Sequence, residues 1–102
     1  MMMTVEPIML EGHPFTAISV QLPKTNLLVV TNKVGYIMCG ALDIALLNEK
    51  LGNRNIVAGR AVGVRTIEEL LKAPLESVTV GAHHVGWTIG MSGEEALLKL
   101  VE

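Results

Sequence analysis

The stretch FTAISVQL at residues 15–22 decides the fold, because its side chains alternate with a period of two. Every second side chain from Thr16 to Leu22 would lie on one face of an extended strand, which gathers the aliphatic set on that face. The turn-forming run EGHP at 11–14 precedes the stretch, and PKTN at 23–26 follows it. Each run predicts a reversal of the chain, so this part reads as consecutive strands joined by hairpins.

Two further runs continue the pattern. Residues 27–31 and 34–38 are rich in β-branched and apolar side chains, and they flank Asn32-Lys33 as in a tight hairpin. Residues 4–39 are therefore predicted to form an antiparallel meander.

The pattern changes after Gly40, where apolar residues dominate a predicted helix that ends near Gly52. Two later helices are indicated by capping boxes, one from Thr66 to Glu69 and one from Ser92 to Glu95. The predicted elements in this half are helices over 41–51, 66–73 and 92–101, a strand over 56–64, and short strands over 78–82 and 85–89.

Strands that come first and then alternate with helices are typical of α+β domains. We predict one α+β domain over residues 1–102, with a mixed, mainly antiparallel sheet built on the N-terminal meander and three helices packed on it. The central helix and the strand after it would form a right-handed crossover.

Composition excludes several classes of protein. The 102-residue chain is 50% hydrophobic, 18% charged and 3% aromatic, with a formal net charge of -2. These values are unlike those of disordered chains or of nucleic-acid grooves. No segment reaches the roughly 18 uncharged apolar residues of a membrane helix, and the start MMMTVEP lacks the features of a signal peptide. We expect a cytoplasmic protein that binds neither nucleic acid nor membrane.

Cys39 is the first candidate for chemistry, because it is the single cysteine and lies where a strand gives way to a helix. Gly40 lets the backbone turn there, and the amides of a helix start favour a thiolate. Asp43, in the first turn, would oppose that effect by charge repulsion. The alternative interpretation is that Cys39 is a small buried hydrophobe and that Asp43 is an ordinary first-turn acid.

His83, His84 and Arg60 are the other candidates. On a strand, the two adjacent histidines would point to opposite faces, so only one could face a cleft. Arg60 lies within an apolar strand and must be paired with a carboxylate, such as Asp43 or one from a partner chain, or be exposed at an edge. Cys39, a histidine and Asp43 suit zinc chemically, but no short ligand spacing joins them, so no metal site is predicted.

Three segments carry a resemblance to a known family. GYIMCGALD at 35–43, VAGRAVGVRT at 57–66 and GMSGEEAL at 90–97 are similar to those of the YunC family, small bacterial and archaeal proteins of unknown function. The likeness covers essentially the whole chain. It implies an α+β domain that forms a complete protein, with no cofactor or activity to carry over, and it makes Cys39-Gly40 and Arg60 the first places to examine.

Three functional hypotheses follow. The apolar central helix in so short a chain favours a homo-oligomeric accessory protein that completes its core against a second copy. A small-ligand-binding or regulatory protein would use Arg60, Gly40 and Asp43. A thiol-dependent hydrolase or transferase would use Cys39 as nucleophile and His83 or His84 as base, with Arg60 holding an anionic substrate.

Overall fold

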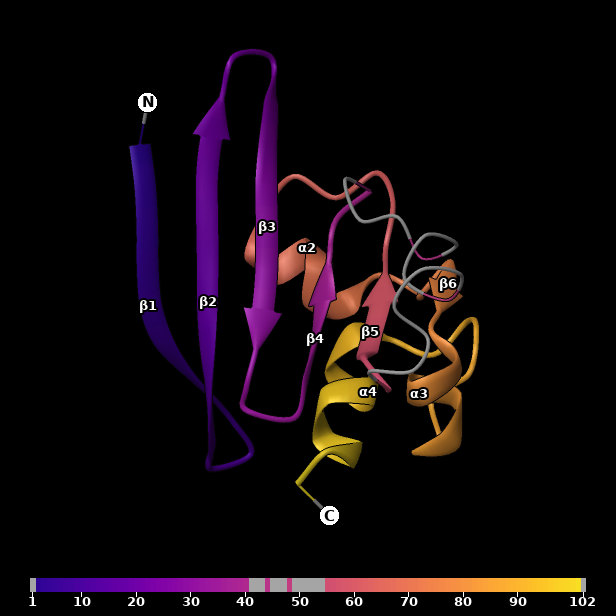
Figure 1. Ribbon diagram of the computed structural model, residues 1–102. Coiled ribbons are helices and arrows are strands. Elements are labelled where there is room, and N and C mark those ends of the chain that lie inside the picture. The colour runs from indigo at the N-terminus through magenta and orange to yellow at the C-terminus, as the bar shows by residue number, and fades with distance from the viewer. Residues whose placement is uncertain (1, 41–43, 45–47, 49–54, 102) are drawn as a thin grey trace.

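The computed structural model describes residues 2–40, 44, 48 and 55–101 of the chain. It contains a six-stranded sheet in the order β1-β2-β3-β4-β5-β6, together with helices α2, α3 and α4 (Figure 1). The predicted fold class is confirmed. The predicted helix over 41–51 falls outside the described residues except for Ile44 and Asn48. The elements are β1 Met2–Leu10, β2 His13–Leu22, β3 Thr25–Thr31, β4 Gly35–Met38, β5 Val57–Arg60, α2 Ile67–Lys72, β6 Ser77–Val78, α3 Val80–His84 and α4 Gly93–Lys99.

The N-terminal meander forms as predicted, because each turn has suitable residues. Glu11 and Gly12 have φ angles of 49° and 82°, which suit the tight turn between β1 and β2. Between β2 and β3, Lys24 takes a φ of 64°. In the turn before β4, the Asn32 side-chain oxygen accepts hydrogen bonds from the backbone N–H groups of Val34 at 2.8 Å and Gly35 at 3.1 Å.

Strands β4 and β5 are parallel, the exception in an otherwise antiparallel sheet. Gly35 lies opposite Val57, and a Cβ atom at position 35 would come within 2.6 Å of the Val57 carbonyl oxygen. β5 ends at Arg60, earlier than the predicted strand over 56–64. The chain leaves the sheet there and bends at Gly63, whose φ is 75°.

The prediction of strands over 78–82 and 85–89 was wrong apart from the two-residue strand β6. Thr79 is 2% exposed and caps α3: its Oγ1 accepts from the N–H of Ala82 at 3.1 Å. This cap starts a helix where the alternation of apolar residues had indicated a strand. After α3 the chain turns, and the Trp87 N–H donates to the carbonyl of Ala82 at 3.1 Å.

Both predicted helix caps are present, with one difference. At α4, Ser92 and Glu95 form the reciprocal pair of bonds that defines a capping box. At α2, Thr66 accepts from the Glu69 N–H at 3.0 Å, but the Glu69 carboxylate accepts from the N–H of Arg65 at 2.7 Å instead of from Thr66. Glu69 therefore anchors the chain one residue before the cap.

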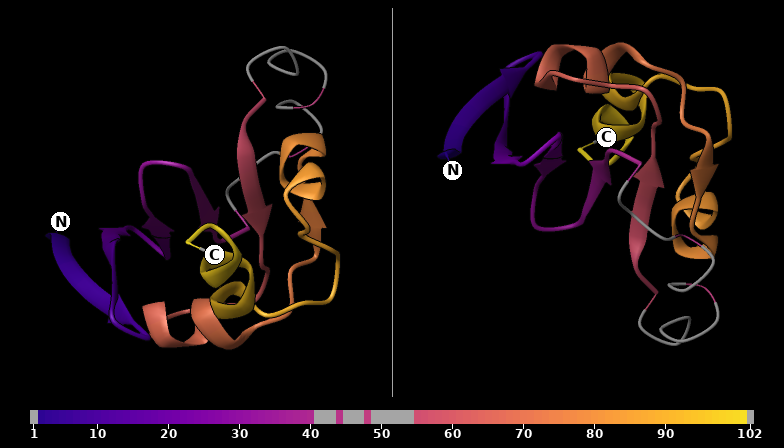
Figure 2. Two further views of the ribbon diagram at one scale, coloured as in Figure 1. Left: turned by 90° about the horizontal axis from the view of Figure 1, so that it is seen from below. Right: turned by 90° about the horizontal axis from the view of Figure 1, so that it is seen from above.

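The core lies on the side of the sheet that α2 and α4 cover (Figure 2). Leu28, Val30 and Ile37 point to this side from β3 and β4, and they are buried together with Leu70 of α2 and Leu97 of α4. Burial of such aliphatic side chains is the main force that holds helices on a sheet. None of the described helices is long and apolar enough to cross a bilayer.

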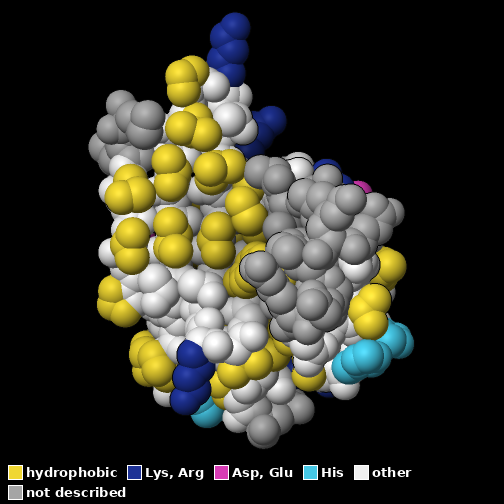
Figure 3. All heavy atoms as spheres, viewed as in Figure 1, with side chains coloured by type: hydrophobic (Ala, Val, Ile, Leu, Met, Phe, Trp, Pro, Cys, Tyr) yellow, Lys and Arg dark blue, Asp and Glu magenta, His cyan; other side chains and the backbone are white. Residues whose placement is uncertain are grey.

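The opposite side of β1–β4 carries a second apolar surface, which we call the open face. Residues directly opposite one another in the strand register share a face of the sheet. Two rows of aliphatic side chains therefore lie next to each other, and Figure 3 shows hydrophobic side chains gathered over these strands. The rows of the open face are Met3, Val20 and Leu27, and then Val5, Ile18, Val29 and Met38.

Candidate functional site

Cys39 follows β4 and is 6% exposed. Its sulfur accepts a hydrogen bond from the Leu28 N–H at 3.5 Å and donates to the Asn26 carbonyl at 3.6 Å. The Cys39 N–H donates to the Leu28 carbonyl at 3.1 Å. The thiol thus faces β3, and its hydrogen bonds within the described residues go to backbone groups and not to a histidine.

This burial leads to a prediction for the thiol. We expect iodoacetamide to alkylate Cys39 in the folded protein at least about a hundredfold more slowly than in the urea-unfolded chain, because reaction requires an exposed thiolate. Mass spectrometry against time at several pH values measures both rates. Alkylation of the folded protein as fast as that of a free thiol would contradict this expectation and would favour the thiol-enzyme hypothesis.

Arg60 ends β5, next to Met38 of β4 and Ser77 of β6. Its Nη1 lies 3.6 Å from Oε2 of Glu76, so the predicted pairing uses a carboxylate that the sequence did not single out. A Cβ atom on Gly40 would lie 3.7 Å from Arg60 Nη2. The structure therefore brings Arg60 beside the Cys39-Gly40 turn. Asp43, the other partner considered, lies outside the described residues.

His83 and His84 lie in the last turn of α3, and both are exposed. Their predicted strand geometry was wrong, because successive side chains on a helix point about 100° apart rather than to opposite faces. His83 borders a small hollow of about 320 Å³ whose other walls include Val78, Val80 and Ile89. Within residues 2–40, 44, 48 and 55–101, no three His, Cys, Asp or Glu side chains gather as a metal site.

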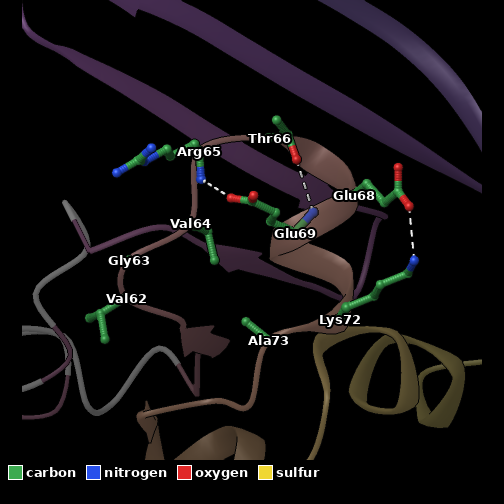
Figure 4. Close-up of a pocket in the computed structure, with 9 residues that line it drawn as sticks. All are labelled: Val62, Gly63, Val64, Arg65, Thr66, Glu68, Glu69, Lys72 and Ala73. Carbon is green, nitrogen blue, oxygen red and sulfur yellow. Dashed lines mark hydrogen bonds and ion pairs between the residues drawn. The ribbon is translucent and has the colours of Figure 1, made fainter.

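A larger hollow of about 730 Å³ lies where the chain runs from β5 into α2 (Figure 4). Val62, Val64 and Ala73 supply its apolar lining. Most of the charged side chains that line it already bind other groups of the chain. The Lys72 ammonium lies 2.8 Å from the Glu68 carboxylate, one turn away on α2, and Glu69 binds the Arg65 backbone.

The pair on α2 also affects proton binding. The hydrogen bond and the charge of Lys72 lower the pKa of Glu68, and the same contact raises the pKa of Lys72. Both groups are fully exposed, so the pair contributes little to stability.

A second hollow, of about 480 Å³, shares Val64 and Arg65 with the first. Its remaining lining comes from the β2–β3 turn: Leu22, Lys24, Thr25 and Asn26. We call this the hairpin hollow. The sequence singled out neither Lys24 nor Arg65 as a candidate. The two lie far apart in the chain, and no local motif connects them.

The fold defines a small α+β protein with a mixed six-stranded sheet, and comparisons with known proteins specify its family. The model of the domain of unknown function DUF1805 matches residues 38–100. The chain is 66% identical over 101 residues to the uncharacterized protein YunC of Bacillus subtilis (strain 168), which covers 99% of this chain and 100% of YunC. The chain belongs to the YunC-like family, as its sequence motifs indicated.

A solved structure has the same fold. It is the crystal structure of TA1206, a protein of unknown function from Thermoplasma acidophilum, with a TM-score of 0.86 and 29% identity. The match covers 97% of this chain and 93% of TA1206. The likeness thus extends over the N-terminal meander as well as the region matched by the family model.

Proposed function

We propose that this protein is a homo-oligomeric accessory protein that buries its open face against a second copy of itself. The observation that carries this proposal is the pair of aliphatic rows on the side of the sheet away from α2 and α4. Met3 and Val5 are 66% and 60% exposed in the single chain. The register places no charged side chain on this face of β1–β4, and the charged residue that continues the row on β5, Arg60 beside Met38, is paired with Glu76.

The size of the open face supports a protein partner. Four strands spaced by about 4.8 Å, over about 20 Å of strand length, give a footprint of about 400 Å². Exposed apolar patches of this size usually mark interaction sites. Thr16, Thr31 and Tyr36 form a further row on the same face. The three rows together span about six residues of each strand, so the footprint of about 400 Å² includes all of them, and it is about half of the roughly 800 Å² per partner of a standard interface.

The free edges of the sheet are less suited to pairing. The two-residue turn at Glu11-Gly12 makes Leu10 and His13 a hydrogen-bonded pair, so the backbone N–H and C=O groups of Leu10 point to β2. This direction alternates along β1, so the backbone groups of Met9 and of every second residue before it point to the outer edge. Pro7 is one of these residues, and it has no N–H to donate. The opposite edge is the two-residue strand β6. Contact through the face is therefore favoured over contact through an edge.

A second copy fits the open face because the aliphatic rows of the two molecules would lie against each other. Sheets that pack face to face bury such surfaces at a spacing of about 10 Å. The sequence predicted self-association from the apolar central helix, and the open face offers a further surface for it. A thiol-dependent enzyme stays the alternative hypothesis, which the alkylation rate of Cys39 tests.

The test compares two exposed valines. Val5 lies on the open face, and Val85 follows α3, where it is 43% exposed. We expect the wild type to sediment as an oligomer at about 10 µM, and Val5→Lys to weaken association at least about tenfold, because a charge would enter the interface. Val85→Lys should associate as the wild type does.

Other outcomes would overturn the proposal. A wild type that stays monomeric at 100 µM, or association unchanged by Val5→Lys, would exclude the open face as the self-association surface. Circular dichroism of both variants checks that they remain folded. Co-sedimentation of a monomeric wild type with anionic lipid vesicles would identify the partner as a membrane and not as a second copy.

A further inference from the structure

We propose that the hairpin hollow binds the phosphate group of a small molecule through Lys24 and Arg65. The two cations come from distant parts of the chain, Lys24 from the turn between β2 and β3 and Arg65 from the segment that enters α2. They line one hollow of about 480 Å³, a size typical of small-molecule sites. This hollow borders the open face at Leu22, which follows Val20 on the same side of β2, but its cations are not part of the aliphatic rows.

The charge of the hairpin hollow favours an anion. Among the residues that the structure describes, its lining contains Lys24 and Arg65 and no carboxylate. Among the residues that the structure describes, the ion pairs are Arg60 with Glu76 and Lys72 with Glu68, so neither Lys24 nor Arg65 belongs to one. Two cations that face one hollow without an acid create a local positive potential.

The acid that contacts Arg65 binds its backbone. The Glu69 carboxylate accepts from the N–H of Arg65 at 2.7 Å, while the Glu69 N–H donates to Thr66 at 3.0 Å. In Figure 4 the guanidinium of Arg65 points away from both Glu68 and Glu69. Glu69 thus fixes the backbone of Arg65 and leaves its guanidinium directed elsewhere.

The backbone has a defined conformation at both cationic residues. Lys24 has a φ of 64°, a conformation that glycine or asparagine adopts more readily in this position of a turn. Arg65 immediately precedes the Thr66 cap of α2 and is held by Glu69. A site whose backbone is already ordered loses less entropy when it binds its ligand, since only the two side chains have to be fixed.

The donor set suits a phosphate group. A guanidinium presents paired N–H donors that match two phosphate oxygens, and a lysine ammonium adds a second charge. Thr25 and Asn26 border the same hollow and supply a hydroxyl and an amide. Leu22 and Val64 provide apolar walls against which the rest of a small molecule would pack.

The test uses inorganic phosphate as the probe and succinate as a competing dianion, both measured by titration calorimetry at low ionic strength. We expect phosphate to bind with a millimolar Kd, and Arg65→Gln or Lys24→Gln to weaken it at least about tenfold, since each removes a charged donor. The matched control is Lys33→Gln, an exposed lysine in the next hairpin turn, which should leave the Kd within about twofold.

Three results would overturn the proposal: no phosphate binding up to 50 mM, binding unchanged in Arg65→Gln, or succinate bound as tightly as phosphate. The last result would mean that the hollow selects charge and not the phosphate group. Thermal melting shows whether each variant is folded, so a loss of binding can be separated from unfolding.

Discussion

Replacing Thr79 by valine is expected to lower the free energy of unfolding by about 3 to 5 kcal/mol, the cost of leaving several buried polar groups without partners. The Thr79 hydroxyl is buried and has three backbone partners. It accepts from the N–H groups of Ala58 at 3.2 Å and Ala82 at 3.1 Å, and it donates to the Ile56 carbonyl at 2.5 Å. Valine has nearly the same shape and can make none of these bonds.

This substitution should affect the join between α3 and the sheet most strongly. The hydroxyl of Thr79 links the start of α3 to β5, and the Thr79 N–H also donates to the Ala58 carbonyl at 2.9 Å. Urea denaturation measures the change. Thr88→Val, at an exposed threonine beyond α3, is the matched control and should change stability by less than about 0.5 kcal/mol. Equal stabilities of the two variants would contradict the role assigned to Thr79.

The second large effect is expected at Gly93, the first residue of α4. A Cβ atom there would lie 2.5 Å from Cδ1 of Ile37 and 2.7 Å from the carbonyl oxygen of Leu70. The Ile37 side chain can shift, but the Leu70 oxygen belongs to the backbone of α2. Gly93→Ala is therefore expected to cost about 2 to 3 kcal/mol, as overpacking of a core does.

Helix propensity predicts the opposite sign for Gly93→Ala, because alanine is favoured over glycine in helices by about 1 kcal/mol. Thermal and urea unfolding thus decide between propensity and close packing. Gly40→Ala is the matched control, since among the described residues the added Cβ would come nearest to Val62 Cγ1 at 3.6 Å and Arg60 Nη2 at 3.7 Å, which are ordinary contact distances. A rise in melting temperature for Gly93→Ala would refute the packing argument.

The parts of the fold that the sequence predicted are those with local signals. The meander follows from alternating side chains between turns that Gly12, Pro23 and Asn32 help to form, and the starts of α2 and α4 follow from Thr66 and Ser92. Each signal acts between residues only a few positions apart, so it can be read without the tertiary structure.

The missed element, α3, depends on long-range contacts. Val78 and Val80 have the β-branched character of a strand, and α3 has only five residues. Its cap residue, Thr79, is held by Ala58 and Ile56 of a preceding segment, which local propensity does not register. Tertiary packing decided the outcome here, as it often does for short segments.

The candidate site was predictable in part. The sequence placed Cys39 at the end of a strand and gave Arg60 a carboxylate partner, but the partner is Glu76 of the segment before β6. The hairpin hollow could not be foreseen, because Lys24 and Arg65 meet only once the β2–β3 turn packs near the entry to α2. Such a juxtaposition arises from topology and not from sequence spacing.

Pro7 has a consequence for the kind of assembly that this chain can build. If the β1 edge of one molecule pairs with the β6 edge of the next, the pairing repeats without a natural end and leads to filaments. Contact between two copies of one sheet face satisfies both surfaces at once and closes the assembly. By removing a backbone donor from the outer edge of β1, Pro7 disfavours this open-ended pairing, which agrees with the closed contact that we propose for the open face.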